Sequence, residues 1–194
     1  MRQIVLASTS PYRRQLLKQL ELPFITAAPP YVEEIDSTVA PELLVRHLAL
    51  GKAQSLAEHY PDALIIGSDQ VFVDHRKRPM GKPGNLHAAF QQLKQMVGKT
   101  HCFYTGLALF DSRSAAAQTD FATFSVTFRN LDDQQISSYL QREKPFDCAG
   151  SFKIEGLGIA LMEKMEGEDY NALIGLPLIK LVTMLDVAGV KVLN

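Results

Sequence analysis

The chain has 194 residues, 46% of them hydrophobic and 21% charged, which is the balance of an ordinary globular protein and excludes a disordered or fibrous chain. The formal net charge of −1 argues against a nucleic-acid polymer as the main partner, because proteins that bind one usually carry a strongly basic face. No apolar run approaches the roughly 20 residues of a membrane span, and the two isolated cysteines, Cys102 and Cys148, favour the reducing cytoplasm.

The beginning of the chain predicts a strand, a turn and a helix. The apolar run Gln3–Ala7 is typical of a buried parallel strand, and leucines at helical spacing indicate a helix over residues 13–20. Ser10 is placed to cap this helix and Pro11 to begin it, because proline lacks only an N–H that would have no partner there.

Arg13 and Arg14 fall in the first turn of this helix, where the positive end of the helix dipole disfavours cations. Together with the hydroxyls of Ser8 and Ser10 and the unpaired backbone N–H groups, they predict one binding spot for a polyanion such as a phosphate chain. The alternative interpretation is a pair of solvated surface arginines on an ordinary capped helix.

A second predicted strand, residues 23–28, leads into an acidic loop with Glu33, Glu34 and Asp36. Such loops are most often solvated surface, but α/β proteins place ligand-binding groups just beyond strand ends. Metal coordination is therefore the second interpretation of this loop.

A helical pattern follows over residues 41–60. Lys52 lies four residues from both Leu48 and Leu56, which places it on or beside the apolar face of this helix. Its side chain either extends along that face to solvent or points inward toward an anion, and the sequence leaves both alternatives open.

An apolar strand predicted at residues 63–73 carries Asp69 and Gln70 where the pattern requires core residues. Burying an unpaired carboxylate is costly, so Asp69 should bind a metal, a cation or a water molecule. Asp69 is therefore the best candidate in the chain for a general base or a metal ligand. The alternative is a structural aspartate that caps a loop.

The remaining segments predict a hairpin and further helices. Gly81 and Pro83 constrain a turn that presents Lys82, and glycines bracket a polar insertion around Glu155. The predicted elements are a helix at 86–96, antiparallel strands at 100–110 and 118–129 with one slip in their alternation, a helix at 132–142, a strand at 159–165, and a helix at 171–187 that is kinked or begun at Pro177. No linker divides the chain, so we expect one α/β domain over residues 1–194, with two lobes and a cleft between them.

Five short motifs occur in order along essentially the whole chain. They are Leu-Ala-Ser-Thr-Ser-Pro-Tyr-Arg-Arg at the first turn, Gly-Ser-Asp-Gln around Asp69, Gly81-Lys82-Pro83, Ala149-Gly150-Ser151-Phe152, and Gly175-Leu176-Pro177-Leu178. In this order they resemble the Maf family of nucleoside triphosphate pyrophosphatases. The Ser-Asp-Gln and Ser-Phe-Lys-x-Glu-Gly segments are similar to its YceF-type branch, which acts on 7-methyl-GTP. The branch that acts on dTTP and UTP has Thr after the Asp and Gln in place of Glu155.

The resemblance implies a mixed α/β fold with a nucleotide-binding cleft between two lobes, a divalent cation such as Mg²⁺ or Mn²⁺, and hydrolysis of a nucleotide to its monophosphate and pyrophosphate. The residues expected to hold the triphosphate are Ser8, Ser10, Arg13, Arg14, Lys52 and Lys82. Asp69 is expected to activate water or to hold the metal, with Glu33 as a second metal ligand. The family commonly has Val-Asp-Glu in the acidic loop, where this chain has Tyr31-Val32-Glu33-Glu34, so Glu34 is the alternative ligand.

Recognition of the base has a physical argument of its own. Guanine offers two adjacent donors on its pairing edge, and the carboxylate of Glu155 can accept both. Methylation at N7 places a positive charge on the ring, which favours stacking on an aromatic side chain such as Tyr12. Gln70 would add an orienting hydrogen bond.

Two other classes of function stay open. One is the sister activity on dTTP, UTP or another unusual nucleotide. The other is a non-catalytic nucleotide sensor that inhibits septum formation, because the family has been linked to arrest of cell division. The oligomeric state is open as well, with a homodimer as one alternative.

Overall fold

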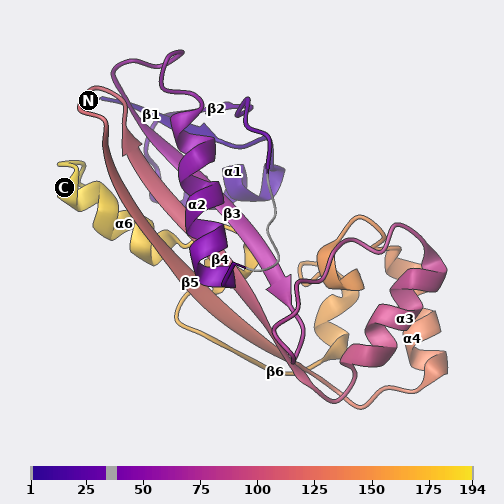
Figure 1. The fold of residues 1–194 in the computed structure, drawn as a ribbon. Helices are drawn as coiled ribbons and strands as arrows, with labels where there is room; N and C mark the ends of the chain where they lie inside the picture. The colour runs from indigo at the N-terminus through magenta and orange to yellow at the C-terminus, as the bar shows by residue number, and fades with distance from the viewer. Residues whose placement is uncertain (1, 34–38, 194) are drawn as a thin grey trace. The chain divides into compact units, whose positions relative to one another are not determined.

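The computed structural model describes residues 2–33 and 39–193, and within it the chain forms two compact units (Figure 1). The first unit is built from residues 1–70, 104–123 and 168–194, and the second from residues 71–103 and 124–167. Each unit is therefore assembled from segments that are distant in the sequence, and each is described by itself. The expectation of a single domain with a cleft between two lobes stays a prediction.

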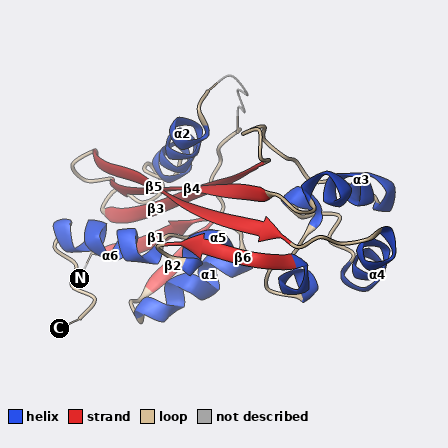
Figure 2. Ribbon diagram, turned by 90° about the horizontal axis from the view of Figure 1, so that it is seen from below, coloured by secondary structure: helices blue, strands red, loops and turns tan. Residues whose placement is uncertain are grey.

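Six strands form one mixed sheet in the order β2-β1-β3-β4-β5-β6 (Figure 2). They are β1 (Gln3–Ala7), β2 (Phe24–Ala27), β3 (Ala63–Val73), β4 (Thr100–Asp111), β5 (Ala116–Phe128) and β6 (Met162–Gly167). Strand β1 pairs in parallel with β2 and β3, whereas β5 and β6 are antiparallel. The predicted mixed α/β class is confirmed.

Helices cover both faces of the sheet in the first unit, as Figure 2 shows. They are α1 (Pro11–Leu17, continued by a 3-10 turn at Lys18–Leu20), α2 (Pro41–Gln54), α5 (Tyr170–Ile174) and α6 (Leu178–Val187). Because side chains alternate along a strand, Leu6 and Ile66 pack with leucines of α1 and α6, while Val5 and Ile65 pack with alanines of α2 on the other face. The unbroken apolar runs of β1 and β3 follow from this two-sided burial.

Two glycines bring α2 unusually close to the sheet. A Cβ on Gly67 of β3 would lie 2.0 Å from the carbonyl oxygen of Ala49, and a Cβ on Gly106 of β4 would lie 2.0 Å from that of Val45. Only glycine fits at such a contact, so the backbone of α2 rests directly on β3 and β4. This contact sets the distance between the sheet and the backbone at Lys52, because Lys52 follows Ala49 by about one helical turn.

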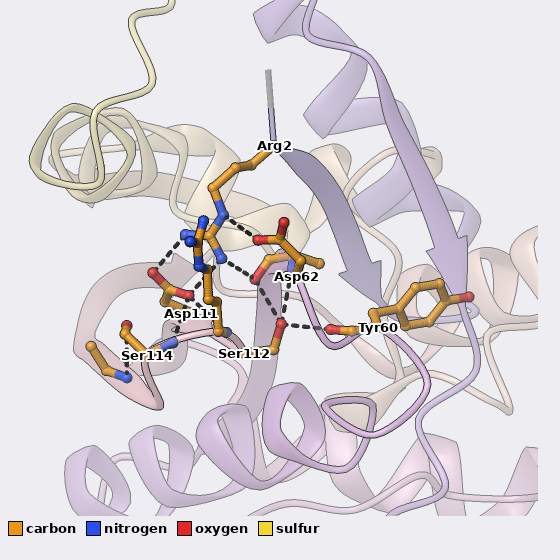
Figure 3. Close-up of polar contacts among 9 residues, drawn as sticks. Arg2, Tyr60, Asp62, Asp111, Ser112 and Ser114 are labelled. Carbon is orange, nitrogen blue, oxygen red and sulfur yellow. Dashed lines mark hydrogen bonds and ion pairs between the residues drawn. The ribbon is translucent and has the colours of Figure 1, made fainter.

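The start of β1 is tied to the turn between β4 and β5 (Figure 3). Arg2 donates from both terminal nitrogens to the carboxylate of Asp111, each at 2.6 Å, and from Nε to Asp62 at 3.1 Å. The Ser112 hydroxyl lies 2.5 Å from the carbonyl oxygen of Tyr60. The guanidinium of Arg2 holds the pKa of the Asp111 carboxyl well below its usual range, so this bidentate pair stays ionised at neutral pH.

The second unit packs two helices, α3 (Leu86–Met96) and α4 (Asp133–Glu143), with 3-10 turns at Ala149–Ser151 and Leu157–Leu161. Its centre is aromatic: the ring of Phe72 lies 4.4 Å from Phe103 and 5.6 Å from Phe152, centroid to centroid. Helix α4 begins with the reciprocal hydrogen bonds of a capping box between Asp132 and Gln135. None of the described helices is both long and apolar enough to cross a membrane.

Three predicted elements have different boundaries. Helix α2 ends at Gln54 because the following hydrogen bonds become i to i+3, although Leu56 still packs in the core. The predicted closing helix is two helices, α5 and α6, because Gly175 adopts φ 126° and Pro177 follows. The predicted strand at 159–165 begins later, at Met162, after a 3-10 turn.

The apparent slip in the second hairpin strand also has a structural reason. Ala122 and Phe124 are buried on the same face of β5 as the later apolar residues, so the inward alternation is regular over this stretch. Phe121 points to the other face, where its ring stacks on Tyr104 with centroids 6.4 Å apart. Phe121 therefore packs on the opposite face of the sheet, and its position does not interrupt the alternation of buried residues in β5.

Candidate active site

The site begins where β1 ends. In the parallel pairing Leu6 lies opposite Ile66, so β3 continues past the last residue of β1 and carries Asp69 beyond it. The turn that leaves β1 at this level contains Ser8 and Ser10. The carboxyl ends of parallel strands are where α/β folds place ligand-binding groups.

The turn after β1 is held by its own serines. The backbone N–H of Ser10 donates to Ser8 Oγ at 3.1 Å, and the N–H of Arg13 donates to Ser10 Oγ at 3.3 Å. The prediction that Ser10 caps the helix and Pro11 begins it is confirmed. Each hydroxyl accepts one of these bonds and still carries a proton that it can donate to an anion.

Successive side chains of β3 serve opposite faces of the sheet. Asp69 points toward α2, where it binds Lys52. Ser68 and Gln70 point the other way, and both donate to backbone oxygens in or just after α5. The alternation of the strand therefore separates the carboxylate from the two polar residues beside it in sequence.

Lys52 joins two carboxylates. Its Nζ lies 2.5 Å from Asp69 Oδ1 and 2.6 Å from Glu33 Oε1. The lysine is only 8% exposed, so its side chain points inward and the alternative in which it extends to solvent is wrong. Of the two acidic candidates, Glu33 makes this contact, and Glu34 lies outside the described residues.

Burial dominates the electrostatics of the Asp69 carboxyl. Loss of solvent raises its pKa above the ordinary value of 3.8, the positive charges of Lys52 and Arg13 act in the opposite direction, and the charge of Glu33 adds to the rise. Burial also lowers the pKa of the Arg13 guanidinium. A carboxylate with a raised pKa in such a place is better suited to accept a proton than an exposed aspartate.

Arg13 is anchored to a distant turn. Its Nε donates to the carbonyl oxygen of Gly175 at 2.9 Å. The hydroxyl of the fully buried Ser68 lies 2.9 Å from the same oxygen and 2.8 Å from the carbonyl oxygen of Gly106, and it shares its single proton between the two. Sequence reasoning missed both partners. The signals that could have found them were the Gly175-Leu176-Pro177-Leu178 motif and a serine in the middle of an apolar strand.

Two cavities border the turn at residues 8–10, and both are lined by Ser8, Thr9 and Ser10. The first, which we call the Lys52 cavity, measures about 360 Å³ and is completed by Ala7, Arg13, Ala28, Pro29, Tyr31, Glu33 and Lys52. The second, the Lys18 cavity, measures about 370 Å³ and is completed by Pro11, Arg14, Gln15, Lys18 and Thr26. Arg13 lines the first cavity and Arg14 the second, and binding of both arginines to one anion stays a prediction.

A family model described as Maf-like protein matches residues 3–188 of the chain. The chain belongs to the Maf family. The predicted family membership is therefore confirmed.

Curated relatives match nearly the whole length of this chain. A protein of Syntrophotalea carbinolica named 7-methyl-GTP pyrophosphatase is 64% identical over 194 residues, which cover 100% of this chain and 98% of that protein. A protein of the same name from Pseudomonas aeruginosa is 48% identical over 192 residues, covering 99% and 100%. A HAM1 protein from Coxiella burnetii has a similar structure, with a TM-score of 0.55 and 15% identity over 96% of this chain and 100% of that one, which supports the fold alone.

The structure also places three residues that were predicted to contact the base: Gln70, Tyr12 and Glu155. Gln70 donates from Nε2 to Thr105 Oγ1 and to the carbonyl oxygen of Ala172, both at 2.9 Å, so its amide holds α5 on the sheet. Tyr12 is 40% exposed on α1. Glu155 is exposed in the second unit. Contact of any of the three with a base stays a prediction.

Lys82 also belongs to the second unit, where Gln92 organises its turn. Gln92 donates from Nε2 to the carbonyl oxygen of Gly81 at 3.1 Å, and its Oε1 accepts from Ser151 at 2.5 Å. One helical side chain thus ties the Gly81-Lys82-Pro83 turn to the Ala149–Ser151 turn. Sequence reasoning found both turns but missed Gln92, which has nothing unusual in its local pattern.

The donor set around Lys52 fits a hard divalent cation. Glu33 and Asp69 each bring an oxygen within hydrogen-bonding distance of the same ammonium group, so two carboxylates already face one point. Among the residues that the structure describes, no three His, Cys, Asp or Glu side chains form a closed metal centre. Two carboxylates completed by water and phosphate oxygens is the arrangement that Mg²⁺ usually adopts.

Proposed function

We propose that this chain hydrolyses 7-methyl-GTP to 7-methyl-GMP and pyrophosphate, as a cytoplasmic enzyme that removes modified nucleotides. The observation that carries the proposal is the buried Asp69 beside the cationic turn at residues 8–14, in a Maf chain that matches proteins named 7-methyl-GTP pyrophosphatase from end to end. The substrate is a free nucleotide, with no nucleic-acid polymer or membrane as a partner.

The triphosphate is held by hydrogen-bond donors and cations at the end of β1. The hydroxyls of Ser8 and Ser10 and the guanidiniums of Arg13 and Arg14 lie on one short segment, and Lys52 faces it from α2. These groups oppose the charge of the bound nucleotide and the charge that builds up on the leaving pyrophosphate. Lys82 is the further cation that we assign to this role from the second unit.

Asp69 carries the chemistry. Its carboxylate accepts a proton from a water molecule while the water oxygen attacks the α-phosphorus. The bond from this phosphorus to the oxygen that bridges it to the β-phosphorus breaks, and the electron pair stays on that oxygen, which leaves with pyrophosphate. Lys52 keeps the carboxylate in position through the bond at 2.5 Å.

Glu33 and Asp69 are the residues that would hold a divalent cation, Mg²⁺ or Mn²⁺. Bound there, the cation would supply Lewis-acid stabilisation of phosphate charge. Lys52 would then shift part of its pairing from the two carboxylates to phosphate oxygens, which its flexible stem allows.

Recognition of the base uses a carboxylate that accepts hydrogen bonds from guanine and an aromatic ring that stacks on the positively charged base. Glu155 accepts both donors of the guanine pairing edge, and Tyr12 stacks on the methylated ring. Gln70 contributes an orienting contact through its amide oxygen, because its Nε2 is engaged with Thr105 and α5.

The deciding experiment measures pyrophosphate release by the purified chain with Mg²⁺ on 7-methyl-GTP, GTP, dTTP and UTP. We expect the highest kcat/KM on 7-methyl-GTP. Higher turnover on the pyrimidine nucleotides would assign the sister activity instead. Binding of a nucleotide without release from any of them would favour the sensor of septum formation. Sedimentation of the same sample distinguishes a monomer from a homodimer.

A further inference from the structure

We propose that Tyr31 is a positioning residue, which holds Glu33 beside Lys52 so that its carboxylate is in place to bind a divalent cation, an inference that rests on the proposed function. Tyr31 belongs to the segment that follows β2, and it lines the Lys52 cavity together with Glu33. It lies in none of the five motifs that carry the family resemblance.

The ring of Tyr31 packs on the backbone of α2 at Gly51. A Cβ at position 51 would lie 2.7 Å from the phenol oxygen of Tyr31 and closer still to two carbons of its ring. Glycine in the interior of a helix is less favourable than alanine, because it loses more backbone freedom on folding. The space that Gly51 leaves free is occupied by the aromatic ring, which accounts for a glycine at this place in α2.

Side-chain contacts hold the segment between β2 and Glu33. Pro29 and Pro30 have no N–H to donate. Between residues that the structure describes, no backbone-to-backbone hydrogen bond involves residues 29–33. The position of this segment therefore depends on what its side chains contact.

Tyr31 and Glu33 reach neighbouring residues of α2. Val32 between them is 84% exposed and does not line the cavity, so the side chains on either side of it face the helix. The ring of Tyr31 lies against Gly51, and Glu33 Oε1 lies 2.6 Å from Nζ of Lys52. The carboxylate of Glu33 is itself half-exposed, and an ion pair of that kind contributes little to holding a segment. The ring of Tyr31 is the anchor that places the carboxylate.

The test is titration of the full chain with Mn²⁺ in the absence of nucleotide, with the free ion measured by electron paramagnetic resonance. Gly51→Ala and Tyr31→Ala should each raise the Kd for Mn²⁺ about three- to tenfold, because a ligand that is no longer held must be ordered when the ion binds. Tyr31→Phe keeps the ring and should keep the wild-type Kd. Tyr31→Ala combined with Gly51→Ala should raise the Kd no further than Tyr31→Ala alone, because the added methyl group has no ring to displace.

Two controls separate positioning from folding. Val32→Ala shortens the neighbouring side chain that faces solvent, and it should leave the Kd for Mn²⁺ unchanged. Gly51→Ala should not lower the denaturation midpoint, since alanine favours a helix and the far end of the Tyr31 side chain can move aside.

Kinetics supply a second measurement. Tyr31→Ala should raise the Mg²⁺ concentration that gives half-maximal pyrophosphate release from 7-methyl-GTP, and it should leave kcat at saturating Mg²⁺ near the wild-type value. A lower kcat at every Mg²⁺ concentration would indicate a merely structural role and overturn the inference.

Wild-type Mn²⁺ affinity in either Gly51→Ala or Tyr31→Ala would also overturn the inference, as would an equal loss in Tyr31→Phe or a wild-type chain that binds no Mn²⁺. If the wild-type chain binds Mn²⁺ but hydrolyses no nucleotide, the proposed function fails, and the Mn²⁺ affinities of the variants still decide the role of Tyr31.

Discussion

The Nε of Arg13 lies 2.9 Å from the carbonyl oxygen of Gly175, a residue 162 positions later in the chain. The carbonyl can face the arginine because Gly175 adopts φ 126°, a backbone conformation that residues with a side chain rarely adopt. With Nε engaged, the donors that the guanidinium can offer to a phosphate are its terminal nitrogens. The turn between α5 and α6 thus orients an arginine of α1.

This anchoring predicts that Ser68 is a positioning residue. Ser68→Ala removes the second donor to the Gly175 carbonyl, and we expect the KM for the nucleotide to rise roughly three- to tenfold with a smaller change in kcat, together with a stability loss of about 1–3 kcal/mol. Ser137→Ala, which deletes an exposed hydroxyl on α4, is the matched control. A wild-type KM in a folded Ser68→Ala enzyme would show that Ser68 has only a structural role.

Asp69→Asn tests the proton acceptor. Asparagine keeps the shape of the side chain but cannot take a proton from water, so pyrophosphate release should fall about 100- to 10,000-fold. Asp120→Asn breaks another lysine–aspartate pair, with Lys180 at 2.6 Å, and should retain activity. Release that survives Asp69→Asn would sink the mechanism.

The raised pKa of Asp69 predicts opposite effects of pH on activity and on stability. Activity requires the carboxylate, so kcat/KM should fall as pH drops through a pKa above 3.8, the ordinary value. The contribution of this group to stability is fully present below 3.8 and is lost as pH rises through the folded-state pKa. The pH profile of kcat/KM and denaturant titrations at matched pH values measure the two trends. An acid limb at or below 3.8 would contradict the prediction.

Gly67 sets the distance between α2 and the sheet. Gly67→Ala should destabilise the protein by about 1–3 kcal/mol or more, because the added Cβ would meet the carbonyl oxygen of Ala49 at 2.0 Å. Moving α2 also moves Lys52 away from Asp69, so activity should fall as well. Gly81→Ala is the stability control, since nothing lies within 4 Å of a Cβ there. Equal denaturation midpoints for the two variants would refute the close contact.

Tyr12 is predicted to read the methyl group on guanine. Tyr12→Ala removes the ring that stacks on the positively charged base, so kcat/KM should fall more for 7-methyl-GTP than for GTP. Tyr12→Phe keeps the ring and should preserve the preference. Equal losses on the two nucleotides in Tyr12→Ala would assign Tyr12 to a contact that does not involve the methyl group.

Local patterns determined much of this protein in advance. The cap at Ser10, the buried strand before it and the inconsistency of Asp69 with an apolar strand are all visible within a few residues, because capping, alternation and desolvation act over short distances. The ordered motifs likewise identified the Maf family from the sequence alone. The structure contains the predicted cap at Ser10, the strand before it and a buried Asp69.

Only the tertiary structure decided how those pieces meet. The inward direction of Lys52 depends on Gly67 and Gly106, which let α2 approach the sheet closely, and its contact with Glu33 depends on where the segment after β2 places residue 33. The orientation of the Arg13 side chain depends on Gly175, far along the chain. Each of these contacts joins residues that no local pattern relates, because the packing of elements across the sheet, and not the propensity of any segment, brings them together.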